Sequence, residues 1–177
     1  MRFTIILLFI LSCFQTQAQK GINFFHGTWE EALVEAKAQD KLIFVDAYAV
    51  WCGPCKRMAK NVFSDKKVGD FYNKNFINMK IDMEKKMGRA FGRTYPVSAF
   101  PTLMYIDYKG ELVHKVKGGQ QIEPFIKLGK FALSKVDNSK DFKVAYEKGD
   151  RSPELVYDYV KALNKAGKPS LKIANEY

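Results

Sequence analysis

A nearly continuous apolar run from Leu42 to Tyr48 constrains the fold of this chain more than any other feature. Its residues are all aliphatic or aromatic except for one acid, Asp46, a composition typical of a strand buried on both faces of a sheet. The run is followed closely by Cys52-Gly53-Pro54-Cys55, in which the proline favours the first turn of a helix. A buried strand that leads directly into a helix predicts an α/β domain.

The segments around this strand predict a mixed sheet. Thr28 and Glu31 have the spacing of a capping box, so a helix is expected from there to about Asp40. A second strand is expected over 76–82, and two more over 102–107 and 111–117, joined by a turn short enough for an antiparallel hairpin. Further helices are expected over 52–63, 65–72, 84–92 and 122–133. The order α-β-α-α-β-α-β-β-α implies helices on both faces of the sheet.

The segment 137–177 is polar and predicts a small helical extension. Two helices are expected, separated by residues 150–153, each with one apolar face. The first face contains Phe142, Ala145 and Tyr146, and the second contains Leu155, Tyr159, Ala162 and Leu163. Gly167-Lys168-Pro169 is expected to end the second helix. The pair resembles the start of a tetratricopeptide-type array, whose single unit cannot bury its own apolar face. Either the helices dock on the main domain or the sequence is truncated.

The first 18 residues have the pattern of a secretory signal peptide. Met1-Arg2 supplies positive charge, residues 3–11 form an apolar run too short to span a bilayer, and Thr16-Gln17-Ala18 offers small side chains for cleavage after Ala18. An uncleaved membrane anchor is one alternative. Lipidation of Cys13 is another, because Leu11-Ser12-Cys13 weakly resembles a lipobox. The pattern predicts a periplasmic or secreted protein.

Only two cysteines remain if the signal peptide is removed, Cys52 and Cys55. An exported protein with a single cysteine pair has no structural disulfide framework, so the pair is expected to serve chemistry. Half of a zinc site is the alternative, but it needs two more ligands. The chain offers only His26 and His114, which do not have ligand spacing. We therefore predict no metal.

The net charge of +10 raises the question of an anionic partner. Acidic proteins and an anionic membrane face are both compatible with a basic surface. The lysines are scattered, with no dense stripe and no recognised nucleic-acid motif. We predict no nucleic-acid binding.

The position of Cys52 at a helix N-terminus predicts its reactivity, since free amides and the helix dipole stabilise a thiolate there. Cys52 would attack a substrate disulfide, and Cys55, expected to be less exposed, would resolve the mixed disulfide. Two sulfurs spaced i, i+3 can join without distorting the backbone. No cofactor is required, because the dithiol is itself the redox group.

Two motifs now resemble one family. Trp51-Cys52-Gly53-Pro54-Cys55-Lys56 is similar to the active-site motif of the thioredoxin family, and Phe100-Pro101-Thr102 resembles its cis-proline loop. The resemblance spans residues 24–136, so a thioredoxin-like domain is expected over 19–136. The likeness is strongest to exported members, such as the C-terminal reductase domain of DsbD.

The resemblance implies roles for further residues. Asp46 matches the buried acid that takes the proton of the resolving cysteine, although an acid at a frayed strand end would simply reach water. Pro101 matches the cis-proline that faces the disulfide and leaves the backbone of Phe100 free to pair with substrate. Trp51 would cover the site or serve packing alone. The substrate-binding set implied by the family is Trp51, Gly53, Pro54, Phe100 and Thr102.

One departure concerns the lysine that the family places near its buried acid. Asn78 stands at that position, while Lys80 lies on the same face of the predicted strand and can substitute for it, unless it is simply a solvent-facing lysine.

Together these features predict an exported thiol–disulfide oxidoreductase that reduces or exchanges disulfides in other exported proteins. Gly53-Pro54 is associated in the family with reducing members, and a reductant in an oxidising compartment needs a membrane electron donor. The alternatives are an oxidase or isomerase and a redox-inert binding module.

Overall fold

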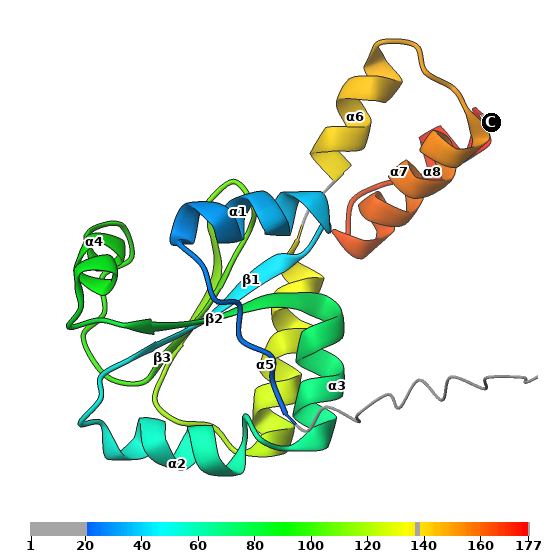
Figure 1. Ribbon diagram of the computed structural model, residues 1–177. Helices are drawn as coiled ribbons and strands as arrows, with labels where there is room; N and C mark the ends of the chain where they lie inside the picture. The colour runs from blue at the N-terminus through cyan, green and yellow to red at the C-terminus, as the bar shows by residue number, and fades with distance from the viewer. Residues whose placement is uncertain (1–20, 137–138, 177) are drawn as a thin grey trace, which may run out of the picture.

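The computed structural model describes residues 21–136 and 139–176, so the predicted signal peptide and Cys13 lie outside the described residues. Among these residues, none of the helices combines the length and the apolar composition of a membrane span. The predicted element order is confirmed up to Val136 (Figure 1). The helices are α1 (Trp29–Ala38), α2 (Gly53–Asn61), α3 (Lys66–Asn75), α4 (Lys86–Thr94), α5 (Ile122–Lys135), α6 (Ser139–Glu147), α7 (Pro153–Lys165) and α8 (Leu171–Asn175).

Four strands form the predicted mixed sheet, in the order β2-β1-β3-β4. They are β1 (Leu42–Tyr48), β2 (Phe76–Asp82), β3 (Thr102–Ile106) and β4 (Leu112–Lys117). β1 is parallel to β2 and antiparallel to β3, and β3 pairs antiparallel with β4. The apolar run that dominates the sequence is therefore an inner strand, with neighbours on both sides.

Alternation along the strands divides the core between the two faces of the sheet. Ile43, Val45 and Ala47 pack against α1 and α4, whereas Leu42 and Phe44 pack against α2, α3 and α5. This arrangement follows from the period of two that a strand imposes on its side chains. Asp46 has the same parity as Phe44, so it belongs to the face that α2 covers.

Aromatic packing ties α3 and α5 to that face. The rings of Tyr72 and Phe125 stack with centroids 4.1 Å apart, and the Tyr72 hydroxyl donates to the Phe125 carbonyl oxygen at 2.7 Å. The same hydroxyl lies 2.6 Å from that of Tyr105. Because burial disfavours the phenolate, the pKa of Tyr72 is raised well above its usual value. These rings fix α3 and α5 against the sheet face that α2 also covers.

Hydrogen bonds between side chains and the backbone set where α1 and α4 begin. Thr28 and Glu31 form the predicted capping box, at 3.2 and 2.7 Å. α4 begins later than expected because Asp82 Oδ1 accepts the Glu84 N–H at 3.1 Å and holds a turn there. α8 was not expected at all, since its five residues are too few for a periodic pattern.

The helices α6, α7 and α8 pack on one another through the apolar faces that the sequence indicated. Their cluster contains Tyr146, Val156, Tyr159 and Leu163. Figure 1 shows them apart from α2, on the far side of the main domain. An ion pair of 3.2 Å between Lys109 and Asp141 connects α6 to the turn between β3 and β4. Whether this extension is an incomplete repeat unit stays a prediction.

Candidate active site

Cys52 and Cys55 form a disulfide with an S–S distance of 2.06 Å. Cys52 is the N-cap residue of α2, and its Sγ accepts the backbone N–H of Cys55 at 3.1 Å. Pro54 lies in the first turn, where a missing N–H costs nothing. When the pair is reduced, the same amide and the positive end of the helix dipole favour a thiolate on Cys52.

Exposure does not distinguish the two cysteines. Cys52 is 3% exposed and Cys55 is 5% exposed, so the expectation that Cys55 is the more hidden of the two is not met. Both pack in one cluster with Ala49, covered in part by Tyr48 and Phe100. The distinction between an attacking and a resolving cysteine therefore depends on the N-cap position of Cys52 rather than on burial.

The loop before β3 lies against this cluster. The Phe100–Pro101 peptide bond is cis, and the Phe100 side chain packs on the cysteines. The Pro101 carbonyl accepts the N–H of Gly118 at 2.8 Å, whereas the N–H and C=O of Phe100 have no backbone partner among the described residues. Thr102 is fully buried and its hydroxyl donates to the Ala99 carbonyl at 2.7 Å, so its side chain points inward and holds the loop.

Trp51 presents an apolar surface beside the disulfide. It is 64% exposed, and its ring meets that of Phe100 edge-on with centroids 5.8 Å apart. Its indole Nε1 donates to Glu84 Oε1 at 2.8 Å. Sequence reasoning missed Glu84, because the two residues are far apart in sequence and no local pattern links them. Val50 is also exposed, so the apolar surface extends along the segment before Cys52.

Asp46 is a buried carboxylic acid with few compensating contacts. It is 1% exposed, and neither of its oxygens has a hydrogen-bond partner among the described residues. Burial raises its pKa to about 7, although the positive charge of Lys80 partly opposes this. A strand-end acid that reaches water is thereby excluded. An acid with a pKa near neutrality can take up and give back a proton under physiological conditions.

Lys80 is the cation next to that acid. Its Nζ lies 4.0 Å from Asp46 Oδ2 and 4.8 Å from the ring centroid of Tyr48, and its side chain is 30% exposed. Asn78 is instead buried two residues away, where its Nδ2 lies 3.4 Å from the Asn23 carbonyl. Lys80, rather than Asn78, therefore lies beside Asp46, and its side chain does not face solvent alone. That it substitutes for the lysine of the family pattern stays a prediction.

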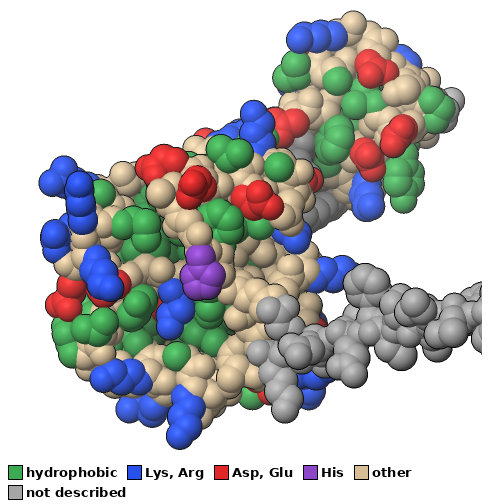
Figure 2. All heavy atoms as spheres, viewed as in Figure 1, with side chains coloured by type: hydrophobic (Ala, Val, Ile, Leu, Met, Phe, Trp, Pro, Cys, Tyr) green, Lys and Arg blue, Asp and Glu red, His purple; other side chains and the backbone are tan. Residues whose placement is uncertain are grey.

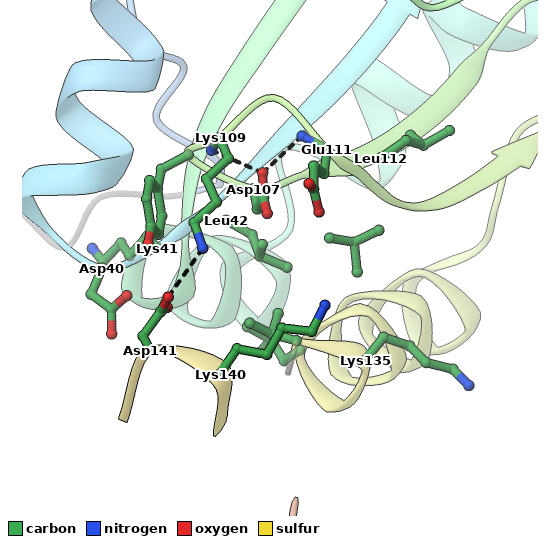
Figure 3. A pocket seen from close by; sticks show the side chains of 14 residues that line it. Asp40, Lys41, Leu42, Asp107, Lys109, Glu111, Leu112, Lys135, Lys140 and Asp141 are labelled. Atoms are coloured by element: carbon green, nitrogen blue, oxygen red, sulfur yellow. Dashed lines mark hydrogen bonds and ion pairs between the residues drawn. The ribbon is translucent and has the colours of Figure 1, made fainter. Parts of the chain in front are cut away.

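Cavities lie both beside this site and away from it. One of about 280 Å³ lies beside it, between α2 and the loop before α5, and its lining includes Pro54, Arg57 and Gly119. Another of about 530 Å³ lies between the β3–β4 turn and the start of α6, away from the disulfide (Figure 3). The carboxylate of Asp107 in its lining accepts hydrogen bonds from two backbone N–H groups of its own turn, so it stabilises that turn. Within 21–136 and 139–176, no three His, Cys, Asp or Glu side chains are grouped to hold a metal ion.

Comparison with known proteins identifies the family. A family model described as a thioredoxin-like domain matches residues 29–133. Thioredoxin-1 of Saccharomyces cerevisiae is 42% identical over 86 residues, which cover 47% of this chain and 74% of that protein. The thiol:disulfide interchange protein DsbD of Pseudoalteromonas atlantica is 31% identical over 106 residues, which cover 59% of this chain. A solved structure of a proposed disulphide-isomerase from Bacteroides thetaiotaomicron is 42% identical, with a TM-score of 0.58, and covers 64% of this chain and 94% of that one.

The matched segments cover very different shares of these relatives. The aligned segment spans only 17% of the DsbD relative, so the comparison concerns one part of a much longer protein. The family model covers more than half of the present chain and includes the sheet, the cysteine pair and the loop of Pro101. By its fold, its Cys52–Cys55 disulfide and this match, the chain belongs to the thioredoxin-like family of disulfide oxidoreductases.

Proposed function

We propose that the protein is an exported thiol–disulfide oxidoreductase that reduces or exchanges disulfides in other exported proteins. The observation that carries this proposal is the cap at α2, where the Cys52 Sγ accepts the Cys55 N–H at 3.1 Å. A sulfur held at a helix N-terminus is stabilised as the nucleophilic thiolate. Cys55 lies one helical turn further on, close enough to form a disulfide with Cys52 and so complete the exchange.

The proposed reaction is thiol–disulfide exchange in two steps. The Cys52 thiolate attacks one sulfur of a substrate disulfide, forms a mixed disulfide and releases the other substrate sulfur as a thiolate. Cys55 then loses its proton and attacks the Cys52 sulfur, which releases the second substrate thiolate and closes the Cys52–Cys55 disulfide. Two electrons pass from the dithiol to the substrate, so no cofactor takes part.

Asp46 is the proposed acceptor of the Cys55 proton. Its carboxylate lies on the sheet face that α2 covers, and a pKa of about 7 matches it to proton exchange at neutral pH. Lys80 keeps part of the Asp46 population ionised and able to accept.

Substrate binding is proposed along the free backbone of Phe100. An extended substrate segment would form main-chain hydrogen bonds with the N–H and C=O of Phe100. The apolar surface of Trp51 and Pro54 would contact the residues around the substrate disulfide. Gly53 leaves room for that approach, since the nearest side-chain atom to a Cβ built there is an Arg57 nitrogen at 3.6 Å.

Export and direction are parts of the same proposal. The pattern over residues 1–18 supports export, and the dipeptide Gly53-Pro54, which has neither charge nor imidazole, supports a reducing pair. Export and a reducing role together require a membrane electron donor, because a reductant outside the cytoplasm must be reduced again after each reaction. Mass spectrometry of the mature protein tests export: a chain that starts at Gln19 supports it, and a lipid on Cys13 replaces cleavage after Ala18 with anchoring.

The decisive measurement is the reduction potential of the Cys52–Cys55 pair, equilibrated with glutathione buffers. We expect a value nearer to about −270 mV, typical of thioredoxin, than to about −120 mV, typical of the oxidant DsbA. A value at the oxidising end would favour the second candidate, an isomerase or oxidase. That candidate has the support of the Bacteroides thetaiotaomicron relative, which is described as a disulphide-isomerase.

A further inference from the structure

Two helices carry an excess of positive charge: α2, which begins at the disulfide, and α4, which begins two residues after Glu84, the partner of Trp51. Neither α2 nor α4 contains an acidic residue, and α4 is preceded by another lysine at its N-cap. The exposed cations are Lys56, Arg57 and Lys60 on α2 and Lys85, Lys86, Arg89 and Arg93 at α4. Figure 2 shows Lys and Arg side chains at α4 and along α2, on either side of a hollow lined by hydrophobic side chains.

Most of these cations have no carboxylate partner. Lys85 forms an ion pair with Asp82 at 3.9 Å, and Arg89 donates to the backbone carbonyl of Glu84. No ion pair with a described residue engages the other five. The carboxylate of Glu84 is engaged by the Trp51 indole. The indole bond leaves the charge of Glu84 in place, but the seven cations still outnumber Asp82 and Glu84, so α2 and the start of α4 carry an excess of positive charge.

Helix stability favours Lys60 and Arg93, which lie in the last turns of α2 and α4, but it does not account for the cations at the helix starts. Cations near a helix N-terminus oppose the helix dipole, and acids there are favourable. α1 follows that rule with Glu30 and Glu31 in its first turn, and α3 has the acid Asp65 as its N-cap, although Lys66 and Lys67 follow it. α4 departs from it, since Lys85 is the N-cap residue and makes no side-chain cap. Departures from local rules near an active site point to a functional demand.

An apolar strip lies between the two groups of cations. Trp51 follows β1 and precedes α2, and its bond to Glu84 joins it to the residue just before the α4 N-cap. Val50 and Trp51 are exposed, and Phe100 contacts the Trp51 ring. A ligand on this strip would contact apolar groups at its centre and cations on both sides.

We propose that this surface selects polypeptides that carry aspartate or glutamate on either side of the disulfide. The inference deepens the proposed function and rests on it. Polypeptides are the polymers that carry disulfides, and an acidic flank satisfies the charge on α2 and α4 while the cystine meets the strip of Val50, Trp51 and Phe100. Complementary charge of this kind raises association rates by about 10- to 1000-fold, and salt suppresses it because the Debye length is about 8 Å at physiological ionic strength.

The test uses the full chain in its reduced form and three synthetic peptides. Each peptide has the same small disulfide loop, flanked by glutamate, glutamine or lysine. The second-order rate constant of reduction is measured by acid quenching and mass spectrometry, at about 20 mM and about 500 mM salt. At low salt we expect the glutamate peptide to react about tenfold faster than the lysine peptide, and the two rates to converge at high salt.

Charge variants locate the effect on the proposed surface. Arg57→Gln combined with Lys86→Gln removes one cation from each helix, and we expect the ratio of glutamate to lysine rates to fall about threefold. The matched control, Lys37→Gln combined with Lys74→Gln, makes the same change in net charge. These lysines are exposed and lie in the last turns of α1 and α3, which lead into the amino ends of β1 and β2. Cys52 follows the carboxyl end of β1, at the opposite end of the strands, so the ratio should hold.

The outcomes separate the two proposals. If the glutamine peptide is reduced but all three peptides react alike, or if both double variants lower the ratio equally, the selection of acidic substrates is wrong and the oxidoreductase function stands. If the glutamine peptide is not reduced at either salt concentration, the proposed function itself fails. An oligonucleotide that blocks reduction of all three peptides at micromolar concentration would assign the cations to nucleic acid and overturn the inference.

Discussion

The Nζ atom of Lys80 lies 4.0 Å from Oδ2 of Asp46, its direct partner across the parallel β1–β2 pair. The acid is buried and the lysine is partly exposed, so Lys80 stands between the carboxylate and solvent. The ammonium also lies over the rings of Tyr48, Phe24 and Phe63, with centroids 4.8, 5.5 and 5.9 Å away. The pair thus joins a buried acid with a raised pKa to a cation that lies over aromatic rings.

Asp46→Asn should make the oxidised protein more stable at alkaline pH. The folded-state pKa of Asp46 is raised from 3.8 to about 7, so the folded chain binds this proton more tightly than the unfolded chain. That stabilisation is fully present below about pH 4 and is lost as the pH rises through 7. Urea titrations at pH 8.5 should give the asparagine variant a higher free energy of unfolding than the wild-type protein, by about 1–3 kcal/mol.

The same titrations at pH 4.5 are the control for this variant. Asp46 is then largely protonated in the folded state, and the two proteins should differ by less than about 1 kcal/mol. Equal stability of the two proteins at both pH values would contradict a raised pKa for Asp46.

Lys80→Met should raise the pKa of Asp46 further. The positive charge of Lys80 lowers that pKa, and methionine retains an unbranched apolar side chain against the same rings without the charge. We expect the Asp46 carboxyl resonance, followed by NMR in protein labelled at that carbon, to titrate about 1 pH unit higher. Lys80→Arg retains the charge and serves as the control. An unshifted titration in the methionine variant would mean that the 4.0 Å pair has no electrostatic effect.

Cys52→Ser should abolish reduction of disulfide peptides, and Cys55→Ser should accumulate a mixed disulfide with the substrate. The reason is the N-cap position of Cys52, since Cys55 donates its own amide to that sulfur. Labelling of the reduced protein with iodoacetamide at pH 7, read by peptide mass spectrometry, should modify Cys52 first. Preferential labelling of Cys55 would reverse the two roles.

Gly88→Ala should destabilise the domain by about 2 kcal/mol or more, because the new Cβ would lie 2.1 Å from the Asp82 carbonyl oxygen. The matched control is Gly92→Ala in the same helix. Its Cβ would meet only the flexible end of Met83, at 3.1 Å, and alanine favours the helix by up to about 1 kcal/mol. Urea unfolding of both variants measures the difference, and equal stabilities would show that α4 can move away from β2.

Much of the fold and the identity of the dithiol could be predicted from the sequence. The strand Leu42–Tyr48, the capping box at Thr28 and the helix that starts at Cys52 all depend on residues within a few positions of one another. Period, capping and turn chemistry act over that range, so they can be read without coordinates. The order of the elements and the mixed sheet followed from the same local patterns.

Contacts between distant segments were decided only by the tertiary structure. It pairs Lys80 rather than Asn78 with Asp46, joins Trp51 to Glu84, and turns Thr102 inward. It also buries Cys52 as deeply as Cys55, which the N-terminal position of Cys52 in a helix does not indicate. The physical reason is common to all four: burial and side-chain pairing depend on which segments pack around a residue, and a local pattern carries no information about its neighbours across the sheet.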